Sequence, residues 1–230
     1  MLHLRRCGKM QFDGTTMNML IKGIGETTYM VALSSLLAYV IGIPLGIALV
    51  VTDGEGIHPV PIFNKGLGLI INLLRSVPFI ILLIMVIPVT RAIVGKIIGC
   101  NATVVPLVIA AAPYIARMVE SSLKEVDGGV VEAAKSMGAS TWQIVVKVLL
   151  PEAKPSLLVG AAISITTILG YSAMAGFTGG GGLGDIAIRY GYHRYQTNMM
   201  LITVALLVII VQLIQEVFMR MSRKSDKRIR

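Results

Sequence analysis

The sequence has few residues of the kinds that build metal centres and disulfide frameworks. Its 230 residues include only two cysteines and three histidines. Cys7 and Cys100 are not part of a Cys-x-x-Cys pair, and the histidines are scattered. A structural metal site needs about four such ligands at regular spacing. We therefore expect no metal ion and no cofactor. We also expect two isolated thiols, with a bridge between them as the minor alternative.

Motifs that bind nucleotides or support hydrolysis are also missing. Gly95-Lys96 is followed by Ile97, where a P-loop needs Ser or Thr, and no lysine follows the glycines between 179 and 184. No nucleophile elbow or metalloprotease helix motif occurs. The chain is therefore expected not to be an enzyme, and any ATP hydrolysis that drives it must take place in a partner chain.

Charged residues are scarce as well, whereas apolar residues dominate. Only 14% of the residues are charged, 55% are hydrophobic, and the mean hydropathy is +0.78. These values lie outside the usual range of soluble domains. Crossing a bilayer takes roughly 20 apolar helical residues. The sequence therefore predicts an all-α polytopic membrane protein with five transmembrane helices, over residues 26–51, 66–87, 104–118, 157–177 and 197–219.

Acidic residues are not expected within the spans. Glu26 and Glu216 fall near predicted helix ends, and the other acidic residues fall in loops or tails. An ion-coupled secondary transporter or channel usually places Asp, Glu or His at membrane depth. An ion-coupled transporter or channel remains the alternative that works by a different mechanism. The lack of acidic residues in the predicted spans favours a permease that an external ATPase drives.

The distribution of Lys and Arg predicts the orientation. If the loop that contains Glu132 lies in the cytoplasm, thirteen of the 21 Lys and Arg residues lie inside, including those of the basic tail 220–230, and eight lie outside. The positive-inside rule therefore favours this orientation. The N-terminal tail 1–23 would then lie outside, and 24–219 would form the membrane domain. The net charge of +9 needs no nucleic-acid partner, because a basic tail beside a bilayer contacts anionic lipid headgroups.

The loop between the third and fourth spans has a distinct local pattern. Apolar residues at helical spacing predict a short helix over 129–137. Gly138 follows where a helix end favours positive φ, and Ser140 and Gln143 have capping-box spacing. A second short helix is expected to end at Pro151. From this pattern alone, the loop is either a compact knob or an amphipathic connector on the bilayer surface.

This loop resembles the EAA loop of ATP-driven importer permeases, the cytoplasmic segment through which an ATPase moves the membrane subunit. The matching residues are Glu132-Ala133-Ala134, Gly138, and Leu150-Pro151. The resemblance implies that loop 126–152 is the coupling segment. It assigns ATPase coupling to these six residues.

Other segments resemble the methionine importer permeases of bacteria: 75–83, 88–91, 112–120 and 170–174. That resemblance implies a multi-pass subunit of the bacterial inner membrane that translocates D- or L-methionine. It also implies a homodimer bound to two copies of an ABC ATPase and served by a substrate-binding lipoprotein. The alternative within the class is a permease for another amino acid or small solute.

The resemblance also implies roles for single residues. Met174 corresponds to the residue that closes the translocation path, and Tyr171 and Ser172 are candidates for polar contacts along it. Pro44 and Pro78 are candidate hinges, although helix packing is the more ordinary role for such positions.

The resemblance fades before Lys22, and Arg5, Arg6 and Lys9 would add positive charge on the outer side. We therefore expect the native chain to begin at Met10 and to lack residues 1–9.

Overall fold

The structure is a computed structural model that describes residues 14–226. Cys7 and the expected start at Met10 lie outside this range. Every regular element in the described range is helical. The long helices are α1 (Gly14–Val51), α5 (Cys100–Lys124), α9 (Lys154–Met174) and α11 (Thr197–Ser225). The shorter ones before the EAA-like loop are α2 (Pro61–Ser76), α3 (Phe79–Met85) and α4 (Ile87–Val94).

Four helices are long and apolar enough to cross a membrane, and a fifth span exists if α2 and α3 count as one broken span. This confirms the all-α polytopic fold. The second span, expected over 66–87, is broken at Val77-Pro78, where α2 and α3 meet at an angle of 101°. Pro78 lacks an N–H and forces the preceding Val77 into an extended conformation, with φ −78° and ψ 122°.

Pro44, the other candidate hinge, does not break its helix. Pro44 lies inside α1, which runs unbroken over 38 residues. The neighbouring glycines instead allow close packing on α5. A Cβ on Gly42 would lie 2.7 Å from Ile115, and one on Gly46 would lie 2.7 Å from the carbonyl oxygen of Ala116. Small residues of this kind bring membrane helices into contact.

Helix α5 is longer than the expected span 104–118. It continues through Pro106 and Pro113 and ends at Lys124. Glu120, which was expected in a loop, therefore lies within this helix and is only 9% exposed. Glu26 also lies inside a helix, α1, rather than near a helix end. Both corrections change where the acidic residues stand relative to the spans.

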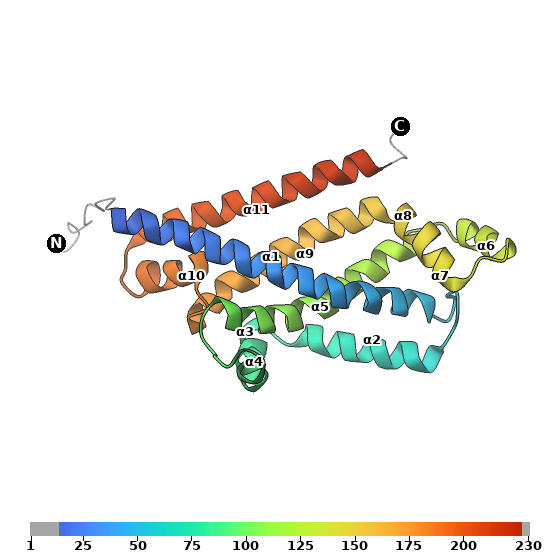
Figure 1. Cartoon of the computed structure of the whole chain (residues 1–230), viewed down its shortest axis with the longest axis horizontal. Coiled ribbons are helices and arrows are strands. Elements are labelled where there is room, and N and C mark those ends of the chain that lie inside the picture. Colours follow the sequence, from blue (N-terminus) through green and yellow to red (C-terminus); the bar gives the residue numbers. More distant parts are fainter. Residues whose placement is uncertain (1–13, 227–230) are drawn as a thin grey trace, which may run out of the picture.

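The core lies between α1, α5 and α9. Figure 1 shows α11 along one side of the molecule and α2 along the opposite side, with the other long helices between them. Leu107, Ile115 and Ala116 of α5 are fully buried, as is Ala38 of α1. Large apolar side chains on the outward faces of α2 and α11, such as Ile62 and Leu213, are exposed. Such faces suit lipid or another membrane helix.

The glycine-rich segment 179–184 is packed into the fold. Helix α10 (Gly182–Ile186) starts within it and is preceded by the 3₁₀ turn η2 (Ala175–Thr178). The backbone N–H of Gly182 donates to Glu26 at 2.8 Å, and that of Leu183 donates to Thr27 at 2.9 Å. A Cβ on Gly182 would lie 2.6 Å from the Thr27 hydroxyl oxygen, so glycine permits this contact. The π-helical turn η3 (Ala187–Tyr192) then leads to α11.

Candidate functional site

The first short helix of the EAA-like loop is α6 (Gly128–Ser136). We call residues 126–152 the coupling segment, after the role that the sequence predicts for them. Asp127 caps α6, because its carboxylate accepts a hydrogen bond of 2.7 Å from the backbone of Gly129. The sequence-based prediction of a helix over 129–137 is confirmed to within one residue at each end. Gly138 follows with φ +80°, as predicted for a helix end that favours glycine.

The second part of the coupling segment begins with the expected capping box. Gln143 accepts from the Ser140 backbone at 2.8 Å, and Ser140 accepts from the Gln143 backbone at 3.4 Å. Helix α7 (Thr141–Ile144) passes into the π-helical turn η1 (Val145–Leu149) and α8 (Leu150–Glu152). The prediction that this helix ends at Pro151 is confirmed to within one residue. Pro151 lies in the first turn of α8, where its missing N–H is tolerated, and the helical path continues to Glu152.

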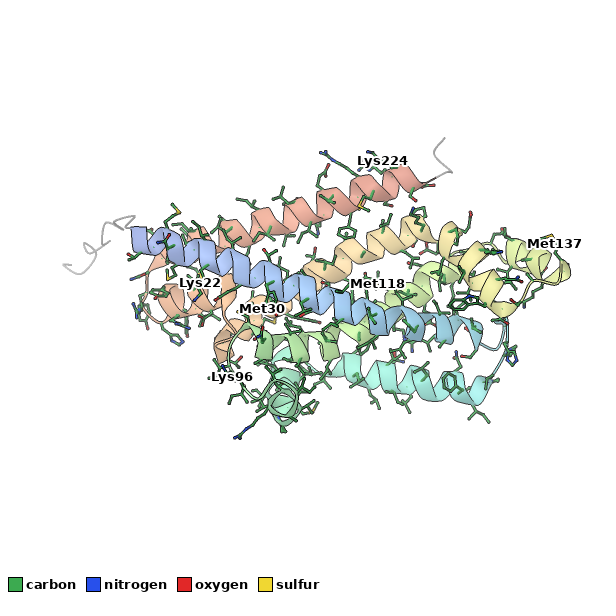
Figure 2. All side chains as sticks on the ribbon, in the orientation of Figure 1. Lys22, Met30, Lys96, Met118, Met137 and Lys224 are labelled. Carbon is green, nitrogen blue, oxygen red and sulfur yellow. The ribbon has the colours of Figure 1, made fainter. Side chains whose placement is uncertain are left out.

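One face of the coupling segment is anchored in the core, and the other is open. Ala134 and Ile144 are 5% and 1% exposed, whereas Met137 and Trp142 are 81% and 72% exposed. Figure 2 shows Met137 at the tip of the molecule, at the end opposite Lys22. Two large apolar side chains left exposed beside a short helical turn suit a protein partner. Trp142, the only tryptophan in the chain, was not identified from the sequence, although its position two residues after the predicted cap Ser140 was a usable signal.

The predicted coupling residues divide between these two faces. Glu132 and Ala133 are exposed, while Ala134 of the same motif packs inward. Leu150 is half-buried and Pro151 is exposed. Glu132 also lines a hollow of about 210 Å³ between the coupling segment and the residues that follow α1. The Glu132-Ala133-Ala134 motif therefore has an exposed surface, and the buried Ala134 packs it against the core.

The predicted gate residues lie far from the coupling segment, at the other end of α9. Met174 is the last residue of α9 and is 44% exposed. Tyr171 stacks on Phe79 of α3, with ring centroids 4.5 Å apart and planes at 6°. Ser172 is buried, and its hydroxyl donates to the Leu169 carbonyl at 2.7 Å. At 1.5 Å per residue, the 21 residues of α9 place Met174 roughly 30 Å from the coupling segment.

The predicted sites are therefore two separate regions joined by α9. The coupling segment leads directly into α9 through α8, and α9 carries Met174 at its far end. Pro78 lies at the bend directly before Phe79, and the Phe79 ring stacks on Tyr171. Pro44 lies inside α1 and is exposed.

Comparison with known proteins gives consistent matches along almost the whole chain. The family described as binding-protein-dependent transport system inner membrane component matches residues 38–230. A probable D-methionine transport system permease protein from Vibrio cholerae is 47% identical over 218 residues, covering 95% of this chain and 97% of its own length. The D-methionine transport system permease protein of Escherichia coli K12 is 48% identical over 158 residues, covering 69% of this chain and 73% of its own.

Solved structures give the same result for the fold. A chain from an inward-facing structure of the MetNI methionine ABC transporter superposes with a TM-score of 0.92 at 46% identity, covering 94% of this chain and 100% of its own. A chain from an amino acid ABC transporter crystallised with histidines has a TM-score of 0.74 at 20% identity, covering 91% of this chain and 95% of its own, and supports the fold alone. The chain belongs to the family of binding-protein-dependent transport system inner membrane components.

Proposed function

We propose that this chain is the permease subunit of an ATP-driven importer that carries methionine across a bacterial inner membrane. The observation that carries this proposal is the 47% identity to a D-methionine permease over 95% of the chain. The chain would act as a homodimer with two copies of a separate ABC ATPase. It would receive methionine from a substrate-binding lipoprotein.

In this proposal the ATPase binds the coupling segment. Met137 and Trp142 provide exposed apolar contacts, and Glu132 supplies a charge beside them. Ala133, Gly138, Leu150 and Pro151 shape the same surface. Because α8 leads into α9, a tilt of the coupling segment moves α9 as a lever. Nucleotide binding and hydrolysis take place in the ATPase, so this chain contributes movement and a path but no chemistry.

Met174 would close the path at the far end of α9. A methionine side chain is unbranched and polarizable, so two copies across a dimer axis can fill an irregular constriction and repack when the helices shift. Tyr171 would hold the position of α9 through its stack on Phe79. Ser172 would stabilise the end of α9 rather than contact solute, because its hydroxyl is bonded to Leu169.

The ion-coupled alternative has one buried carboxylate in its favour, Glu120 in α5. That carboxylate lies 2.6 Å from Arg117 and 3.0 Å from Lys124. Two cations already neutralise it, so it is poorly suited to bind a coupling proton or metal cation. The ion pairs of Glu120 therefore favour an external ATPase over an ion gradient as the source of energy for transport.

A competition assay tests the substrate. Uptake of radiolabelled methionine by vesicles that contain the permease, its ATPase and its binding protein should fall when excess unlabelled D- or L-methionine is added. Excess histidine should leave uptake unchanged. Inhibition by histidine and not by methionine would favour the alternative of a permease for another amino acid.

Orientation follows from the same proposal, with the coupling segment and the C-terminus in the cytoplasm. We expect Lys96→Cys and Asn198→Cys to react with an impermeant thiol reagent in intact cells, and Ser136→Cys to react only after the membrane is opened. All three positions are exposed. Cys7→Ser and Cys100→Ser would remove the background thiols. Labelling of Ser136→Cys alone in intact cells would reverse the orientation.

A further inference from the structure

Four charged side chains form a chain of ion pairs where the end of α5 meets residues 52–60, which connect α1 to α2. Lys124 Nζ lies 2.6 Å from Asp53 Oδ2 and 3.0 Å from Glu120 Oε1. Arg117 lies 2.6 Å from the other oxygen of Glu120. We call Asp53, Arg117, Glu120 and Lys124 the α5 ion cluster.

The α5 ion cluster joins parts of the fold that are distant in sequence. Arg117 donates a hydrogen bond of 3.1 Å to the carbonyl of Gly68 in α2. Asp53 belongs to the connector 52–60, which Lys135 of α6 also contacts through a 3.4 Å hydrogen bond to Gly56. The coupling segment, the connector, α2 and the end of α5 are therefore linked by a continuous set of polar contacts.

Glu120 is the centre of this set. Its side chain is 12% exposed, compared with 24% for Arg117, 36% for Asp53 and 47% for Lys124. The hydrogen bond from Lys124 keeps the pKa of Asp53 below its ordinary value, so that carboxylate stays ionised at neutral pH. Removing a buried charge leaves its partners unpaired and is far more disruptive than removing an exposed one.

The far end of α2 connects to the gate region. After the bend at Pro78, α3 begins with Phe79, whose ring stacks on Tyr171 of α9. Tyr171 precedes Met174 by three positions on the same helix. Movement of the coupling segment can thus reach Met174 by two routes, directly along α9 and through the α5 ion cluster and α2.

We propose that Glu120 is a positioning residue that ties the coupling segment to α2, so that α2, α3 and α9 move together when the ATPase acts. This inference rests on the proposed function for the existence of an ATPase partner but not on the identity of the solute. Residues packed in a contiguous network with two arrangements can carry such coupling, and only a coupling measurement establishes it.

The test measures a change at the proposed gate residue, Met174, and not the transport of the solute. In a Cys7→Ser, Cys100→Ser background, Met174→Cys introduces a thiol whose labelling rate is measured in the purified complex with and without ATP. We expect ATP to change that rate, and Glu120→Gln to reduce the ATP-induced change at least about fivefold, a typical allosteric coupling factor. Basal ATP hydrolysis should persist, which shows that the complex is assembled. Glu120→Asp keeps the charge and should restore most of the response.

Glu216→Gln is the matched control. Glu216 pairs with Arg220 on the exposed face of α11, with side chains 59% and 73% exposed, so the same chemical change there should leave the labelling response intact. An unchanged response in Glu120→Gln would overturn the inference. If the Glu120→Gln complex fails to assemble, Asp53→Asn is tested instead, because Asp53 is a more exposed member of the α5 ion cluster. A reduced labelling response to ATP in Asp53→Asn would support the inference, and a wild-type response would refute it. If methionine is not the substrate, the result will be different: the wild-type complex will show the labelling response to ATP but will not import methionine.

Discussion

Gly138→Val should leave the permease inserted and dimeric but at least about fivefold less responsive to its ATPase. Gly138 has φ +80°, a conformation that strains a β-branched residue by about 1–3 kcal/mol. A shift of that size changes a local equilibrium at least about fivefold. A Cβ at this position would meet no heavy atom within 4 Å, so the effect must come from backbone strain and not from a clash. The measurement is stimulation of ATP hydrolysis by the loaded binding protein.

Two controls separate coupling from general strain. Asparagine tolerates positive φ, so Gly138→Asn should retain most of the stimulation. Gly95 has φ +75° and equally open surroundings, but it follows α4, near Lys96 and away from the coupling segment. Gly95→Val therefore imposes the same strain elsewhere and should leave stimulation near wild type. Wild-type stimulation in Gly138→Val, or loss in that variant only through failed insertion, would contradict the coupling role.

Met174→Ala should make the closed permease leaky. If a pair of Met174 side chains fills the constriction, truncating both to alanine opens a gap that no neighbouring side chain fills. We expect passive efflux of methionine from preloaded vesicles, without ATP, to rise severalfold while the ATPase stays bound. Met221→Ala on α11 is the control, because Met221 is 48% exposed and Met174 is 44% exposed. Equal efflux from both variants and from wild type would reduce Met174 to a packing role.

The coupling segment could be predicted closely from the sequence because its signals are local. A glycine at positive φ and a capping box act within a few residues, and both appear where they were expected, at Gly138 and at Ser140 with Gln143. The helical path also ends within one residue of Pro151, where the end was expected. Whether a proline ends a helix depends on how the preceding turn adapts, and here a π-helical turn precedes it.

Pro78 indicated where the second span bends, but the size of the bend and the burial of Glu120 could not be predicted in this way. Hydropathy measures how long an apolar run is, and it does not show that the chain turns by 101° within the run. The third span was expected to end at Met118, but α5 passes through Pro106 and Pro113 and continues to Lys124. Arg117 and Lys124 lie three and four positions from Glu120, a spacing that favours ion pairs on one helix, but Asp53 reaches the cluster only through tertiary packing.

The glycine-rich segment shows the same limit. Composition at 179–184 indicates backbone freedom, which a flexible loop and a tightly packed turn both require. Only the contacts with Glu26 and Thr27 of α1 identify the packed turn.

The central claim is that a separate ATPase drives methionine through this chain, and transport into sealed vesicles tests it most directly. Vesicles that contain the purified permease and its ATPase, with methionine-loaded binding protein on the side of Lys96, should accumulate methionine when ATP is supplied to the side of Met137. Accumulation should stop when a nonhydrolysable analogue replaces ATP, and it should persist when ionophores collapse all ion gradients. Accumulation that needs an ion gradient and proceeds without ATP would contradict the account.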